Sequence, residues 1–143
     1  MKRQQLLLLI LAFGVFSILN TEMGIIGILP MAAEMYQVDI VQAGMLVSLF
    51  ALGVAIAGPT MPLLCSRFNR KHVMLLVLGV FTICNALAVV ASDFQLLLVL
   101  RVVPAFFHPV YCALAFSVAA ASVAPEDAPR AVARINMGVA AGM

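Results

Sequence analysis

Four long apolar runs constrain the fold of this chain more than any other feature. They cover residues 6–30, 40–64, 73–91 and 96–121, and a fifth begins near residue 131 and is incomplete at 143. An α-helix of about 20 mostly apolar residues crosses the hydrocarbon core, and it satisfies its own backbone polar groups in lipid. The sequence therefore predicts an all-α membrane protein with four transmembrane helices plus the start of a fifth.

The composition agrees with a lipid environment. Hydrophobic residues make up 65% of the chain and charged residues 10%, with a mean hydropathy of +1.17, whereas a soluble domain carries about 25% charged residues. The net charge is only +2, so nucleic acid is not an expected partner. The sequence pattern contains no catalytic nucleophile, metal-ligand cluster or phosphate loop. We therefore expect no enzyme activity, no cofactor and no metal.

Basic residues predict the orientation, because short loops rich in lysine and arginine stay in the cytoplasm. The breaks that would lie on one side carry Lys2, Arg3, Arg67, Arg70, Lys71, Arg130 and Arg134. The two breaks on the opposite side carry Glu34, Asp39 and Asp93 and no basic residue. The amino terminus is thus expected to be cytoplasmic.

Two ionisable residues, Glu22 and Arg101, fall inside predicted spans, where a charge costs about 2.5 to 3.5 kcal/mol on insertion scales. At 1.5 Å per residue, Glu22 lies roughly 24 Å from the inner surface and Arg101 roughly 9 Å below the outer surface. Both belong to the outer half and could meet if the first and fourth helices are neighbours. Glu22 is either a proton acceptor or counter-ion for a cationic substrate, or a side chain that reaches interfacial water. Arg101 either pairs with a carboxylate or lines a cavity, or extends to the interface.

Helical spacing divides the fourth run into two faces. The small and polar face, expected to contact protein or water, consists of Arg101, Pro104, Ala105, His108, Cys112, Ala115 and Ala119. The apolar face, expected to contact lipid, consists of Val99, Val103, Phe106, Val110 and Leu114. His108 is either a proton relay or a donor to a backbone carbonyl.

Glycines and prolines form a second group of candidates. In the second run, small residues and prolines predict close helix approach and a bend near the inner surface: Gly53, Gly58, Pro59 and Pro62. Pro104 and Pro109 are expected to bend the fourth run. These positions are either moving hinges or ordinary packing features.

The chain resembles a known family, the major facilitator superfamily. Residues 62–71, Pro-Leu-Leu-Cys-Ser-Arg-Phe-Asn-Arg-Lys, are similar to that family's G-x-x-x-D-R-x-G-R-R loop between helices two and three. Arg67, Arg70 and Lys71 match the pattern, whereas Pro62, Ser66 and Asn69 replace its glycines and its acid. Arg101, within residues 97–105, resembles the arginine of the fourth-helix motif. Residues 20–22, 29–30 and 51–55, together with Gly44, resemble the opening of the arabinose and nucleoside efflux branch.

The resemblance implies the N-terminal part of a twelve-span proton antiporter that exports drugs, sugars or related metabolites by alternating access. Within it, Glu22, Arg101 and His108 would couple protons in a cavity, and Arg67, Arg70 and Lys71 would form the conformational-switch loop. Its partners would be a small-molecule substrate, protons, the lipid bilayer and the missing C-terminal helices. Its expected location is the bacterial inner membrane.

Two other classes remain open on the sequence. One is a complete four-span transporter that works as a dimer, like the small multidrug family. The other is a non-transporting membrane assembly subunit, in which Glu22 and Arg101 pair with a partner's helix. The sequence also leaves open whether the chain is a fragment or a truncated reading frame.

Overall fold

The computed structural model describes the backbone of residues 2–143 and the side chains from Arg3 onward. Its elements are α1 (Lys2–Tyr36), α2 (Ile40–Cys65), α3 (Arg70–Val89), α4 (Phe94–Ala105), α5 (His108–Ala121), the 3-10 turn η1 (Pro125–Asp127) and α6 (Ala128–Gly142). Four segments are long and apolar enough to cross a membrane: Arg3–Tyr36, Ile40–Cys65, Arg70–Val89 and Phe94–Ala121. The predicted all-α membrane fold is therefore confirmed.

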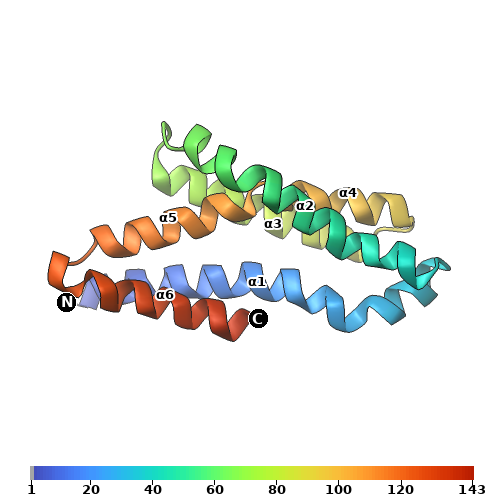
Figure 1. The fold of residues 1–143 in the computed structure, drawn as a ribbon, viewed down its shortest axis with the longest axis horizontal. Helices are drawn as coiled ribbons and strands as arrows, with labels where there is room; N and C mark the ends of the chain where they lie inside the picture. Colours follow the sequence, from blue (N-terminus) through green and yellow to red (C-terminus); the bar gives the residue numbers. More distant parts are fainter. Residues whose placement is uncertain (1) are drawn as a thin grey trace.

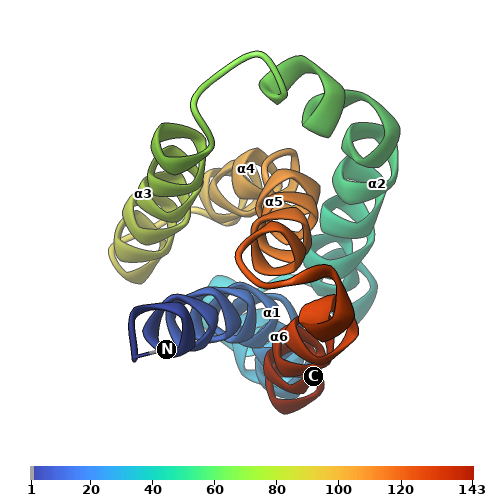
Figure 2. The ribbon, with the colours of Figure 1, turned by 90° about the vertical axis from the view of Figure 1, so that its left-hand side faces the viewer.

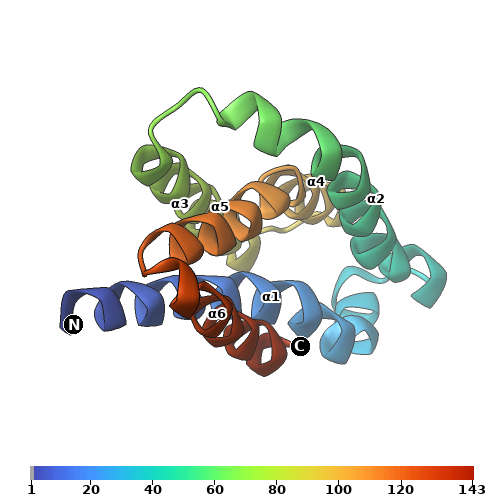
Figure 3. The ribbon, with the colours of Figure 1, turned by 60° about the vertical axis from the view of Figure 1, so that its left-hand side comes forward.

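The helices run along the long axis of the molecule (Figure 1). Seen along that axis, α4 and α5 lie between α3 and α2, and α1 pairs with α6 (Figure 2). The N-terminus and the α2–α3 and α5–α6 connections lie toward one end, whereas the α1–α2 and α3–α4 connections lie at the other (Figures 1 and 3). The breaks that carry the basic residues thus lie toward one end of the bundle.

Two apolar clusters form the core. The larger one joins α1, α3, α5 and α6 and includes Leu11, Val15, Ile18, Val77, Phe81, Tyr111 and Ile135. The smaller one joins α1, α2 and α4 at the other end and includes Ala32, Leu46, Phe94, Leu97 and Leu98. The fourth span contributes to both clusters, so it ties the two ends of the bundle together.

The fourth span is broken where the sequence predicts a bend. The helix stops after Ala105 and restarts at His108. Pro109 has no N–H to donate to the Ala105 carbonyl, and it suits the first turn of a new helix. Shorter-range bonds close the break, from Phe107 N to the Pro104 oxygen (3.0 Å) and from Val110 N to the Phe107 oxygen (3.1 Å). The result is a discontinuous helix with His108 at the restart.

The helices extend beyond the apolar runs at several ends. α1 continues to Tyr36 instead of stopping near residue 30, and α6 begins at Ala128 instead of near residue 131. Pro129 occupies the first turn of α6, which favours this earlier start. A helix can continue into the interface, so hydropathy alone does not locate its ends. α2 stays one helix through Pro59 and Pro62.

Neighbouring helices leave little room for a Cβ at four glycines: Gly14, Gly53, Gly138 and Gly142. A Cβ at Gly53 would lie 3.0 Å from the Ala105 Cβ, so α2 and α4 pack closely there. Among the described residues a Cβ at Gly58 would meet nothing within 4 Å, so no helix of this part of the chain approaches it closely. α6 packs backbone to backbone on α1, where a Cβ at Gly138 would lie 2.4 Å from the Ala12 oxygen and one at Gly142 2.8 Å from the Phe16 oxygen.

Candidate proton-coupling site at the broken fourth span

Arg101 joins the fourth span to the middle of α1. Its Nη1 donates to the backbone oxygen of Thr21 and its Nη2 to that of Glu22, both at 2.8 Å. The planar guanidinium suits this two-pronged contact, because its donors are held in a fixed fork. Arg101 is half-buried and reaches α1 instead of the outer interface. The charge is therefore held by backbone carbonyls, which the sequence could not indicate.

The Glu22 carboxylate is paired with His108. This histidine begins α5, whereas Arg101 lies in α4. Glu22 Oε2 lies 3.1 Å from His108 Nε2, and the two side chains are 21% and 12% exposed. The two atoms are at ion-pair distance, yet their alignment does not make a hydrogen bond. The expected neighbourhood of Glu22 and Arg101 exists, but the carboxylate partner is the imidazole.

Phe50 of α2 completes the cluster. The Arg101 guanidinium carbon lies 5.1 Å from the centre of the Phe50 ring. The imidazole of His108 meets the same ring edge-to-face, with centroids 6.0 Å apart. Phe50 is only 2% exposed, so α2 presents a fixed aromatic face to both basic groups. This residue could not be singled out from the sequence, because one phenylalanine in an apolar span carries no distinguishing signal.

Three buried nitrogens in this cluster have no hydrogen-bond partner among the described residues: Arg101 Nε, His108 Nδ1 and His108 Nε2. Buried polar groups are normally paired, so such atoms call for a physical explanation. A carboxylate and an imidazole are both groups that can bind a proton. The arrangement can hold a proton between α1 and the broken fourth span, and it leaves donors free for a further polar group.

Arg101 also lines a cavity of about 540 Å³ between α1, α3 and α4, together with Thr21 and Asn85. Glu22 is not part of that lining. A cavity shared by Glu22 and Arg101 is expected of the complete transporter, and it stays a prediction. Arg101 stands between the cavity on one side and the Glu22–His108 pair on the other.

The small and polar face of the fourth span is turned inward, and each of its seven residues is buried or half-buried. Val99 and Val103 of the apolar face are exposed, at 58% and 41%. Val110 was also expected to contact lipid, but it is fully buried. α5 packs against α1, α2, α3 and α6, so part of its apolar face is covered by protein as well.

The basic connection between α2 and α3 is separate from this site. Arg67, Arg70 and Lys71 are exposed at the end of the bundle. In the part of the chain that the structure describes, the ion pairs are Glu22–His108 and Asp127–Arg130. Asn69 caps α3 by accepting from Lys71 N at 3.0 Å. The connection therefore shows a helix cap and exposed basic groups that have no acidic partner among the described side chains.

A family model described as the Major Facilitator Superfamily matches residues 11–143. The chain belongs to the major facilitator superfamily. This finding confirms the family resemblance. The alternative assignment to the small four-span multidrug family is therefore wrong. It also places the discontinuous fourth span in a family of membrane transporters.

Named relatives agree with this family. The inner membrane transport protein YdhP of Escherichia coli K12 is 36% identical over 132 residues, which are 92% of this chain and 34% of YdhP. The putative transporter AraJ of the same strain is 31% identical over 132 residues, again 92% and 34%. A probable sugar efflux transporter of Helicobacter acinonychis is 28% identical over 108 residues, 76% of this chain and 28% of that protein.

The chain spans about a third of the length of the curated relatives it matches. The match therefore fits an N-terminal fragment of the transporter fold. No solved structure gives a significant match.

Proposed function

We propose that this chain is the N-terminal part of a secondary transporter of the inner membrane that exports small molecules by proton antiport with alternating access. Its substrate would be a drug, a sugar or a related metabolite. A transporter role follows from the family, and the names of two relatives, an inner membrane transport protein and a probable sugar efflux transporter, are consistent with location and direction. The C-terminal helices would supply the other half of the substrate pathway.

The observation that carries the proposal is the Glu22–His108 pair at the break of the fourth span. The carboxylate and the imidazole lie 3.1 Å apart in a mostly enclosed position. When a proton binds, the pair changes its net charge in a low-dielectric setting, where charge is costly. Because one partner belongs to α1 and the other to α5, protonation would change how strongly the two helices hold together. That is a physical route from proton binding to helix movement.

Arg101 would keep the site in register. Its two bonds to the carbonyls of Thr21 and Glu22 fix the guanidinium on α1. Phe50 contacts both basic groups, so a change in the position of either one would be transmitted to α2. Gly53 and the prolines of the second and fourth spans would serve as the packing and hinge positions of the moving helices.

The proposed orientation places the N-terminus and the Arg67–Lys71 connection in the cytoplasm. Three basic breaks lie toward one end of the bundle, and short basic loops remain inside. In the transport cycle, Arg67, Arg70 and Lys71 would form switchable contacts with the C-terminal half, since the chain itself offers them no acidic partner among its described side chains.

A transport measurement tests the proposal. The full-length protein would be reconstituted in proteoliposomes with an imposed proton gradient, and the movement of ethidium and of radiolabelled arabinose would be followed. We expect accumulation of at least one probe against its concentration gradient, abolished when the proton gradient is collapsed. Transport that ignores the proton gradient would refute antiport.

A matched pair of variants isolates the carboxyl. Glu22→Gln should greatly slow gradient-driven accumulation, because the amide cannot take up a proton. Glu34→Gln changes an exposed glutamate on the same helix, and it should transport normally. Equal activity of the two variants would remove Glu22 from the mechanism.

A further inference from the structure

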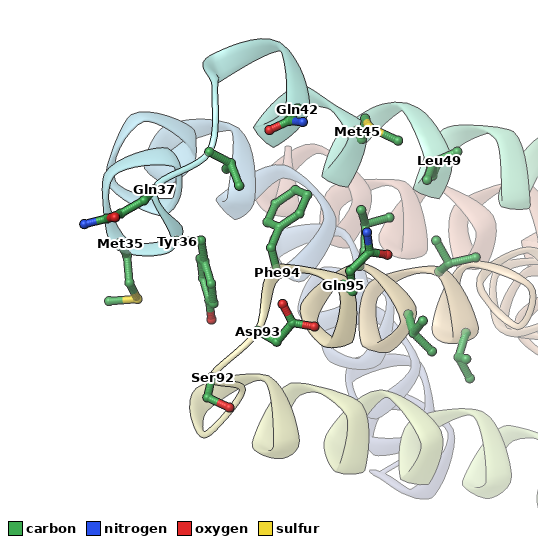
Figure 4. Close-up of a pocket in the computed structure, with 15 residues that line it drawn as sticks. Met35, Tyr36, Gln37, Gln42, Met45, Leu49, Ser92, Asp93, Phe94 and Gln95 are labelled. Atoms are coloured by element: carbon green, nitrogen blue, oxygen red, sulfur yellow. The ribbon is translucent and has the colours of Figure 1, made fainter.

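A cavity at the acidic end of the bundle lies apart from the Glu22–His108 pair. It has a volume of about 750 Å³, within the range of small-molecule sites. The end of α1, the start of α2 and the start of α4 form it, and Figure 4 shows side chains of all three converging on it. We call it the outer cavity; its lining includes Met35, Tyr36, Met45, Ser92, Asp93 and Phe94.

One carboxylate supplies the charge of the outer cavity. Asp93 precedes α4 at the capping position, yet its side chain makes no capping hydrogen bond. It lines the cavity together with uncharged polar side chains such as Gln42 and Gln95. No lysine or arginine belongs to the lining, and the two breaks at this end contain none. The carboxylate therefore lacks a basic partner and leaves a negative potential in the cavity.

Aromatic and sulfur groups supply the remaining contacts. The rings of Tyr36 and Phe94 meet edge-to-face, with centroids 6.1 Å apart. The Tyr36 hydroxyl donates to the Ala91 oxygen at 2.9 Å, so the ring is held in place by the α3–α4 connection. Aromatic faces attract cations, and methionines adapt to ligands of varied shape. A fixed aromatic pair, two methionines and one free carboxylate form a combination suited to a bulky organic cation.

We infer that the outer cavity binds organic cations that carry aromatic or aliphatic groups. Asp93 provides the charge, and Tyr36 and Phe94 provide the apolar contact surface. Small inorganic cations would gain little there, because a single carboxylate is a weak metal site. The place of this cavity in an export cycle rests on the proposed function, but the binding itself can be measured without transport.

Protection of an introduced thiol tests the inference in the purified, full-length protein in detergent. The native Cys65, Cys84 and Cys112 are replaced by serine, and Ser92→Cys places a thiol in the cavity lining. The control Val90→Cys lies two residues away, 74% exposed and outside the lining. Tetraphenylphosphonium should slow maleimide labelling of Ser92→Cys and leave labelling of Val90→Cys unchanged. Tetraphenylborate, an anion of the same shape, should protect neither.

The carboxylate is tested in the Ser92→Cys protein. Asp93→Asn should raise the tetraphenylphosphonium concentration for half-protection by about three- to tenfold, the range for loss of one partly solvated charge contact. Asp39→Asn is the matched control, since Asp39 also precedes a helix without a side-chain cap and lies outside the lining. It should leave the value unchanged. Asp93→Glu should retain most of the protection, which separates loss of charge from misfolding.

The outcomes are decisive in either direction. Equal protection of Ser92→Cys and Val90→Cys, protection by tetraphenylborate, or equal behaviour of Asp93→Asn and Asp39→Asn would each overturn the inference. Selective protection in a protein that fails to transport would keep the cavity and reject the proposed function. Proton-driven transport without selective protection would keep the proposed function and reject cation binding in the outer cavity.

Discussion

Replacing Gly138 by alanine should loosen the contact between α6 and α1. A Cβ at this position would lie 2.4 Å from the Ala12 oxygen and 3.0 Å from its carbonyl carbon, where ordinary contact begins at 3.4 Å. The obstacle is backbone, which cannot turn aside as a side chain can. The two helices must therefore separate by about 1 Å along a seam that also buries Val15 and Ile135. Overpacking of this kind costs about 1 to 3 kcal/mol.

The assay is the unfolding of the full-length protein in mixed micelles with increasing denaturing detergent. Gly79→Ala is the control, because a Cβ at Gly79 would meet nothing within 4 Å. We expect Gly138→Ala to lose about 2 kcal/mol relative to Gly79→Ala, which should be unchanged or slightly more stable because alanine favours helix. Equal free energies of unfolding, within about 0.5 kcal/mol, would contradict the packing of α6 on α1.

Three further predictions concern the site and the orientation. Phe50→Leu should lower the free energy of unfolding by about 1 to 2 kcal/mol in the same assay, since it removes the ring that contacts both basic groups; no change would mean that the ring contacts are incidental. Arg101→Lys should greatly reduce transport in proteoliposomes, because one ammonium cannot reproduce the two parallel bonds to α1 carbonyls. Wild-type activity of this variant would refute the need for the two-pronged guanidinium contact. An impermeant maleimide applied to intact cells should label Val90→Cys and miss Phe68→Cys, although both positions are exposed; the opposite pattern would invert the proposed orientation.

The fold class followed from the sequence because hydropathy and helix length are local properties. Long apolar runs require helices in lipid, and prolines at 104 and 109 mark a bend, which the structure resolves as a break. The burial of α5 on several sides was not predictable, because it depends on which helices pack around it. Val110 therefore changes from an expected lipid contact to a core residue.

The site was predictable only in part, for a related reason. Depth along the helices placed Glu22 and Arg101 at one level, since rise per residue is fixed. The azimuth of each side chain depends on tertiary packing, and this decides that the carboxylate meets His108 while the guanidinium meets backbone oxygens. Backbone acceptors carry no sequence signature at all. Gly138 could not be singled out from the sequence, because the need for glycine there comes from the Ala12 backbone of the neighbouring helix.

The most direct test of the account is a double-mutant cycle on Glu22 and His108 in the full-length protein. Rates of proton-driven efflux would be measured for Glu22→Gln, His108→Gln and the double variant, and their ratios converted to changes in the transport barrier. At the 3.1 Å separation of the pair, an effective dielectric constant near 20 gives about 5 kcal/mol as an upper bound, and measured couplings between contacting residues are about 0.5 to 3 kcal/mol. We predict a coupling of at least 1 kcal/mol between Glu22 and His108, with the double variant no slower than the slower single variant. Additive effects, within about 0.5 kcal/mol, would show that the two residues act independently and contradict the proposed coupling.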